Sequence, residues 1–239
     1  MNPIRRLALL SLALTALLAR PAAGQEIRSP IRYVEQGQGL GVFGGWVFAD
    51  PNVTLNDSTT AEMAPQPAPI FGIQYQVRAS GPLSVAASLG YIPSTRKVFL
   101  AEANADSSAI RPIDTGREAD VGILLLDAGL LFNLTGPRTY RGLAPFVGAR
   151  VGYARQITGK DADDVLVTEG ERYRFGPSFA VSANLGTDVF VSRRLSLRAE
   201  LTGRLWRESP PAGFRARGLT KLAEWNNASS AQIGAVLRF

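Results

Sequence analysis

Seven charged side chains lie within segments whose other residues are apolar or small, and they are the residues best placed to do chemistry. Buried charges are costly unless they are paired, so we predict that these side chains form a network of ion pairs that fills an interior. The excess of arginines over acids supports an alternative, which is a narrow polar path for ions or a small anionic solute. The set comprises Arg78, Asp127, Arg150, Asp188, Arg198, Glu200 and Arg204.

Enzyme chemistry is disfavoured because the chain contains no histidine. A serine–histidine–acid triad is therefore excluded, and so is a metal site with imidazole ligands. Pairs of carboxylates remain conceivable, but no two acids have a convincing spacing. We predict that the protein is not an enzyme and has no catalytic residues, no metal and no cofactor.

The charged side chains sit in segments that alternate, residue by residue, between apolar and small or polar side chains. In segment 195–204, leucine and alanine recur at every second position, and Arg198, Glu200 and Arg204 lie between them. Alternation with period two indicates a β-strand with two unlike faces. The pattern occurs eight times, near 40–48, 71–78, 83–91, 121–134, 147–153, 179–189, 195–204 and 232–239.

Segment 121–134, VGILLLDAGLLFNL, is apolar enough to be mistaken for a membrane-spanning helix. A helix needs about 20 apolar residues to cross a bilayer, whereas a tilted strand needs only about 9–11. The segment is too short for a helix and carries Asp127 in its middle. We therefore predict that it is a strand.

The connections between these segments alternate between short and long. Bacterial outer-membrane barrels show this asymmetry, with short periplasmic turns and longer extracellular loops. We predict an all-β fold, a closed antiparallel transmembrane β-barrel of eight strands. Ten strands are the alternative if Lys97–Ala101 or Asp164–Thr168 forms an added hairpin. The short links lie at 80–82, 135–143 and 192–194, and the long ones lie at 50–69, 93–120, 156–176 and 207–227.

The composition of the polar face indicates which side of the barrel meets lipid. That face is rich in glycine, alanine and serine, which suits the narrow interior of an eight-stranded barrel. The apolar face is then predicted to meet lipid, with an aromatic band at each membrane interface. A soluble exported β-protein with scattered aromatics is the alternative. The predicted bands are Trp46, Phe48, Tyr91, Tyr153 and Phe179 at the long-loop end, and Phe132, Phe190 and Phe239 at the short-turn end.

The start of the chain has the features of a secretory signal peptide. Arg5 and Arg6 precede an apolar run that is too short to span a membrane as a helix, and small residues before Gln25 fit a cleavage site. We predict a cleaved signal at 1–24 and one outer-membrane barrel domain at 25–239. The net charge of +6 falls to +3 without the three arginines of the signal, and so weak a bias predicts no nucleic-acid partner.

The chain ends on a strand-like segment, QIGAVLRF, with a terminal aromatic. Chain ends are commonly frayed, so a terminal strand this regular should be paired, and a closed barrel pairs it with the first strand. This ending, together with APFVGARVGYARQ and SFAVSANLGTDVFVSRRLSLRAELTGRLW, resembles the small bacterial outer-membrane β-barrel proteins of the OmpA/OmpX type. The resemblance implies that the barrel assembly machinery recognises a C-terminal signal made of Ile233, Ala235, Leu237 and Phe239.

We expect a structural or surface-interaction role, with the lumen plugged by ion pairs and the long loops displayed. A narrow channel or transporter for ions or small solutes is the alternative. A lipid-modifying enzyme is the least favoured function, since the resemblance implies a histidine in the active sites of such barrels. Arginine pairs well with phosphate, so outer-membrane lipid, including lipopolysaccharide, is a predicted partner of the loops. Interleaved acids are equally consistent with an ordinary solvated surface.

Overall fold

The computed structural model describes residues 30–34, 37–56, 59–103, 110–158, 172–173, 175–208 and 224–239. Within these ranges every regular element is a β-strand. In the described part of the chain, no helix is long and apolar enough to cross a membrane. The predicted signal peptide at 1–24 and the alternative strand Asp164–Thr168 lie outside the described residues.

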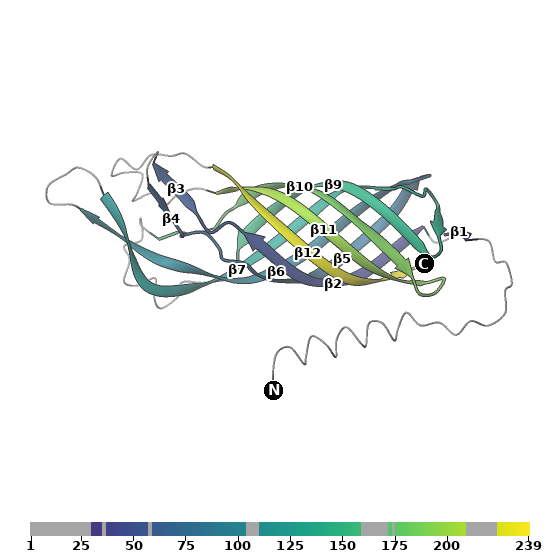
Figure 1. The fold of residues 1–239 in the computed structure, drawn as a ribbon, viewed down its shortest axis with the longest axis horizontal. Coiled ribbons are helices and arrows are strands. Elements are labelled where there is room, and N and C mark those ends of the chain that lie inside the picture. The colour runs from purple at the N-terminus through teal and green to yellow at the C-terminus, as the bar shows by residue number, and fades with distance from the viewer. Residues whose placement is uncertain are drawn as a thin grey trace, which may run out of the picture.

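Eight strands close into a barrel in which each strand pairs antiparallel with both neighbours. They are β2 (Gln38–Ala49), β5 (Ala68–Ser80), β6 (Leu83–Ala103), β7 (Ile110–Asn133), β9 (Leu143–Gln156), β10 (Ser178–Phe190), β11 (Leu195–Glu208) and β12 (Glu224–Arg238). Around the ring they follow one another in this order, and β12 returns to β2. Figure 1 shows the strands crossing the barrel at a tilt. The predicted eight-stranded barrel is confirmed.

The last strand closes the barrel. β12 pairs with β2 from Ala228↔Ala49 to Arg238↔Gly39. The terminal Phe239 is itself held, because its N–H donates to the Gln38 carbonyl oxygen and its carbonyl accepts from the Gln38 N–H, both at 3.0 Å. The ring therefore has no edge strand whose backbone groups would be left unpaired in lipid.

Side chains alternate along each strand between an outward face and the lumen. In β12, Leu237 is 53% exposed, whereas Val236 and Arg238 on either side of it are buried. The outward rows are apolar, whereas the charged side chains of the strands and many small and polar ones face inward, which is the reverse of a water-soluble protein. An apolar outer band is what a barrel needs to span a bilayer, and the predicted orientation of the two faces is confirmed.

β6 and β7 continue as a paired ribbon beyond the barrel. Their pairing runs on to Ala103↔Ile110, and Figure 1 shows the ribbon projecting from the long-loop end. The stretch 93–120, predicted to be a loop, is therefore strand for most of its length. Lys97–Ala101 belongs to β6 and adds no strand to the ring, so the ten-stranded alternative is wrong. Antiparallel neighbours continue to satisfy each other's backbone groups after they leave the wall.

Two short strand pairs occupy the ends of the barrel. At the long-loop end, β3 (Val53–Asn56) pairs with β4 (Thr59–Ala61). At the short-turn end, β1 (Ile31–Tyr33) pairs with β8 (Arg138–Tyr140), which lies in the connection before β9. Figure 1 places β1 beside the C-terminus, at the end opposite to β3 and β4.

The aromatic bands follow the prediction with one correction. Trp46, Phe48, Phe179 and Phe239 are among the exposed outward side chains. Phe190 instead has the inward parity of β10 and lies with its ring centroid 4.9 Å from the Cζ atom of Arg238. The assignment of Phe190 to the lipid-facing band was wrong. Val189, the preceding residue in the strand, faces outward, and adjacent strand residues point to opposite faces.

Candidate functional site: the lumen of the barrel

The register of β10 and β11 brings the first charge pair together. Asp188 lies opposite Arg198, and Arg198 donates from Nε and Nη2 to the two carboxylate oxygens at 2.8 Å each. Both side chains are buried in the short-turn half of the lumen. This bidentate geometry is the strong form of an arginine–carboxylate pair.

The same cluster extends across the tube. Asp188 also accepts a hydrogen bond from Arg238 of β12, so one carboxylate holds two guanidinium groups. Arg198 donates in turn to the side-chain oxygens of Gln74, at 3.2 Å, and Gln76, at 2.7 Å, in β5. Because β5 is adjacent to neither β10 nor β11 in the ring, these bonds cross the interior of the barrel.

A second pair joins Arg150 of β9 to Glu200 of β11, over the strand between them. Two Nη atoms of Arg150 each lie 2.9 Å from a carboxylate oxygen of Glu200. Gly186 of β10 faces Glu200 in the register, and a Cβ there would lie 2.4 Å from the Ala199 carbonyl oxygen. A glycine is therefore required at position 186, where the backbones of β10 and β11 approach closely.

A third pair joins Arg204 of β11 to Asp127 of β7, with Nη2 2.7 Å from Oδ2. Gly152 of β9 stands opposite Asp127, and a Cβ there would lie 2.0 Å from Asp127 Oδ1. The small residues on the inner face thus leave room for charged side chains that reach over a neighbouring strand.

The predicted network needs two corrections. Arg78 contacts no acid in the described part of the chain; its Nη1 atom donates to the Val34 carbonyl oxygen at 2.7 Å. Arg238 was missed, although its alternation with Leu237 and Phe239 would have placed it on the inner face. With Arg238 included, four arginines pair with three acids, since Arg150 meets Glu200, Arg204 meets Asp127, and Arg198 and Arg238 share Asp188.

Two of these arginines are also held by aromatic rings. The Cζ atom of Arg198 lies 4.6 Å from the ring centroid of Phe146, and Arg238 stacks on Phe190. A guanidinium over an aromatic face gains cation–π attraction, which is strongest away from water. Each of these guanidinium groups is thus fixed by a carboxylate in its plane and a ring against its face.

The long-loop half of the lumen is filled by apolar side chains, which we name the apolar seal. Trp206 and Phe175 form its centre, with ring centroids 5.0 Å apart in an edge-to-face arrangement. Sequence analysis missed the seal, although apolar residues at inward positions of β2, such as Val47, were a signal for it. The seal comprises Val47, Met63, Ala64, Ile70, Ile92, Val121, Ile123, Leu125, Phe175 and Trp206.

The connection between β4 and β5 supplies Met63 and Ala64 to the seal, and backbone hydrogen bonds hold it in place. The Gln66 N–H donates to the Thr95 carbonyl oxygen at 2.9 Å, and the Ser94 hydroxyl donates to the Gln66 carbonyl oxygen at 2.6 Å. Ala64 N–H bonds a further carbonyl in the loop before β3. This connection therefore folds inward and covers the opening of the barrel at the long-loop end.

An ion pair at the rim ties the same connection to the ribbon. Lys97 of β6 donates to the Glu62 carboxylate. This hydrogen bond and the Glu62 charge raise the pKa of the Lys97 ammonium group above its ordinary value of 10.5. The pair lies in water, where it is a positioning contact more than a source of stability.

Several buried polar atoms at mid-lumen have no hydrogen-bond partner among the residues that the structure describes. They include both amide atoms of Asn184, the Ser182 hydroxyl and Asp127 Oδ1. Buried polar groups of this kind are normally solvated by ordered water. These atoms lie among the ion pairs, because Asp127 belongs to one of them and Ser182 is in register with both Arg150 and Arg204.

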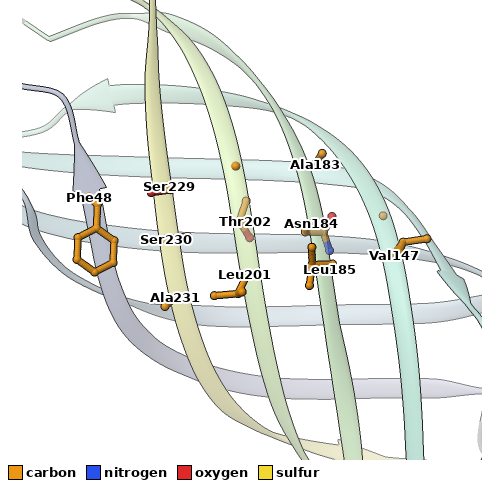
Figure 2. A pocket seen from close by; sticks show the side chains of 12 residues that line it. Phe48, Val147, Ala183, Asn184, Leu185, Leu201, Thr202, Ser229, Ser230 and Ala231 are labelled. Carbon is orange, nitrogen blue, oxygen red and sulfur yellow. The ribbon is translucent and has the colours of Figure 1, made fainter.

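A hollow of about 510 Å³ lies on the outside of the wall, over β9 to β12 and β2. Figure 2 shows Ala183 and Ser229 along it, with Phe48 at one end and Leu201 and Leu185 beneath. These side chains belong to the outward rows, and the inward residues Asn184, Thr202 and Ser230 of the same strands complete the lining. The hollow lies in the wall, and its outward side chains face the membrane.

The predicted assembly signal lies in the outward row at the short-turn end of β12. Ile233, Leu237 and Phe239 are exposed, and Ala235 is half-buried. Their recognition by the assembly machinery stays a prediction.

Comparison with known proteins identifies the architecture. No known family profile matches the chain, and no curated protein matches it by sequence. The structure of Neisserial surface protein A is similar, with a TM-score of 0.52 and 12% identity over 85% of this chain and 97% of that one. The outer membrane protein OprG from Pseudomonas aeruginosa gives 0.51 and 13% over 85% and 97%. The chain thus has the fold of the small outer-membrane β-barrels, and the finer assignment to the OmpA/OmpX type stays a prediction.

Proposed function

We propose that this protein is a closed outer-membrane barrel with a structural or surface-interaction role. The observation that carries the proposal is that the lumen is obstructed at two successive levels, first by cross-lumen arginine bridges and then by the apolar seal. In this proposal the short turns face the periplasm and the ribbon faces outward.

The arginine bridges oppose the passage of ions. The interior of an eight-stranded barrel is just wide enough to hold its own side chains, and these bridges run between strands that are not neighbours. An ion could pass only by parting a buried pair, and an uncompensated buried charge is strongly unfavourable. The bridges therefore act as a plug in the static structure.

The long-loop end supports surface display. The ribbon of β6 and β7 carries exposed charges of both signs, including Arg117 and Glu118, and it stands clear of the barrel in Figure 1. At the long-loop end we propose contacts with lipopolysaccharide and with an unidentified surface partner. We propose no catalytic role, and the absence of histidine from the chain supports that.

A narrow anion path is the second candidate. It is favoured by the inner-face arginines, which outnumber the inner-face acids, and by the polar atoms of Asn184 and Ser182 that have no hydrogen-bond partner among the described residues. Conduction would require the apolar seal to open, and Met63 and Ala64 of the seal belong to a connection between strands and not to the barrel wall.

Single-channel recording in a planar bilayer tests the proposal. The mature chain, residues 25–239, is refolded, and a heat-dependent gel shift confirms that the barrel has formed. We expect no steady conductance at high protein load, from the wild type or from two matched variants of β9. In these variants, Arg150→Ala removes a lumen bridge and Arg155→Ala removes an exposed outward arginine.

Steady conductance in the wild type would contradict the closed barrel. An anion preference that Arg150→Ala lowers and Arg155→Ala leaves unchanged would establish the channel instead.

A further inference from the structure

The short-turn end of the barrel carries a group of exposed arginines, which we name the arginine rim. The segments 30–34, 134–142 and 191–194 that bear it contain no aspartate or glutamate. Among the described residues, none of these guanidinium groups has a carboxylate partner. The rim comprises Arg32, Arg138, Arg141, Arg193 and Arg194.

The three segments form one continuous surface. β1 pairs with β8, and the Arg141 N–H donates to the Pro30 carbonyl oxygen at 2.6 Å. The Phe190 N–H, at the edge of the β10–β11 turn, donates to the Gly142 carbonyl oxygen at 2.8 Å. The rim is therefore assembled from stretches far apart in the sequence and held by backbone bonds.

Exposed apolar side chains are interleaved with the rim arginines. Tyr33 faces Arg138 across the β1–β8 pair, and Ile31 faces Tyr140. These three apolar side chains are all at least half exposed, and so are Leu134 and Val191 in the neighbouring turns. Aromatic and apolar groups beside cationic tips are typical of the boundary between lipid headgroups and acyl chains. A purely aqueous partner would not require them.

Arg141 occupies a position that its turn does not favour. It has φ 51° and is followed by Gly142 with φ 82°, in the tight link from β8 to β9. Two-residue turns with both φ values positive favour Asn-Gly, because a Cβ is disfavoured in this region. The Arg141 Cζ atom lies 5.5 Å from the ring centroid of Tyr140. The turn geometry gives no reason for an arginine here, whereas an anion site does.

We propose that the arginine rim binds the phosphate headgroups of anionic glycerophospholipids in the periplasmic leaflet. The proposal rests on the orientation given under the proposed function, with the short turns in the periplasm. Arginine presents planar paired donors that match phosphate oxygens, and basic residues at a membrane surface attract anionic lipid. The rim would anchor the barrel at a fixed depth and gather anionic lipid around the short turns.

Electron spin resonance of spin-labelled lipid tests this proposal. The refolded mature chain is placed in phosphatidylcholine vesicles that contain a trace of spin-labelled phosphatidylglycerol or spin-labelled phosphatidylcholine. We expect wild-type protein to immobilise phosphatidylglycerol preferentially. The pair Arg138→Gln with Arg193→Gln should lower that preference by about fivefold or more, given the effect of one basic residue at a membrane surface.

The matched control is Arg155→Gln with Arg207→Gln. Both of these arginines are exposed near the opposite end, and the change in charge is the same. Glu208 and Glu224 lie beside Arg207 in the β11–β12 register, so we expect the control to keep most of the preference. An equal loss in the two variants, or no preference in the wild type, would overturn the proposal.

Two further measurements separate the sources of phosphate and the effects of folding. Inorganic phosphate added at constant ionic strength should leave the preference for phosphatidylglycerol in place. If phosphate abolished that preference, the ligand would be a soluble anion. Arg141→Asn should fold at least as stably as the wild type, because asparagine tolerates the turn, and should still lose part of the preference. A folded, non-conducting barrel without lipid preference would contradict lipid binding by the arginine rim and would leave the proposed function unaffected.

Discussion

The charged part of the lumen and its mouth at the long-loop end are built from the same strands, yet they are closed by opposite chemistry. β10 gives Asp188 to the ion-pair layer and Ala180 to the apolar layer, and β11 gives Arg198 to one and Trp206 to the other. The first layer is closed by directional bonds between charges. The second is closed by close packing of apolar side chains around Trp206.

This difference implies two kinds of response to damage. Removing one partner of a buried ion pair leaves an uncompensated charge, so a single substitution among the ion pairs should cost a large part of the free energy of unfolding. Trimming a packed apolar group costs the transfer energy of the lost atoms plus a cavity, so the mouth weakens by degrees. Substitutions in the two layers, and at the ion pair outside them, test this difference.

Asp188→Ala should have the largest effect. It leaves both Arg198 and Arg238 buried without their shared carboxylate, and we expect the free energy of unfolding to fall by about 3–5 kcal/mol. Urea unfolding in lipid vesicles, followed by tryptophan fluorescence, measures it. Asp114→Ala, at an exposed carboxylate of the ribbon, is the control and should change little. Equal losses in the two variants would mean that Asp188 has no special role.

Met63→Ala tests the apolar layer and should cost less. Met63 is buried, but it lies in a connection that can relax, so we expect a loss of about 2–3 kcal/mol, at the low end of the range for buried methionine. Conductance should stay silent because the ion-pair layer is intact. Leu100→Ala, at an exposed ribbon position, serves as the control. A conducting Met63→Ala variant would show that the apolar seal alone closes the barrel.

A double-mutant cycle on Arg150 and Glu200 measures the coupling within one bridge. Each single alanine variant leaves a buried charge, whereas the double variant leaves none. The cost of the double variant should therefore fall short of the sum of the singles by about 1–2 kcal/mol. Urea unfolding of the four proteins gives this coupling free energy. Strict additivity would rule out a direct pair and weaken the plug interpretation.

Lys97→Gln should have the smallest effect, because the Lys97–Glu62 pair lies in water. The pKa of Lys97 is raised by Glu62, so the stability from the pair is fully present below about pH 10.5, the ordinary lysine value. It is lost only as the pH rises through the higher folded-state pKa. Thiol labelling of a Met63→Cys variant reports whether the connection between β4 and β5 stays folded into the barrel. Rapid labelling of Met63→Cys at neutral pH in a protein that also carries Lys97→Gln would contradict this expectation. It would show that the ion pair, and not the backbone bonds of Gln66, holds the β4–β5 connection in place.

Much of the fold was predictable because a strand has a strict period of two. Leu237 and Arg238 had to face opposite ways, and the glycines and serines of the inner rows required a narrow interior. The ribbon was missed because residues 93–120 have the composition of a loop and become strand only through pairing with each other. Phe190 was misplaced because its aromatic type was given more weight than its parity.

Local alternation along the chain was enough to predict which face of each strand meets lipid and that most of the strand charges face the lumen. The tertiary structure was needed to show that eight strands close the ring and which charges meet. Arg150 reaches Glu200 across β10, and Asp127 reaches Arg204 across β9 and β10. It also decided that Met63 folds inward to join Trp206, and that five arginines from three distant segments share one rim. Such contacts depend on the register, tilt and closure of the barrel, which place residues side by side regardless of their separation in the sequence.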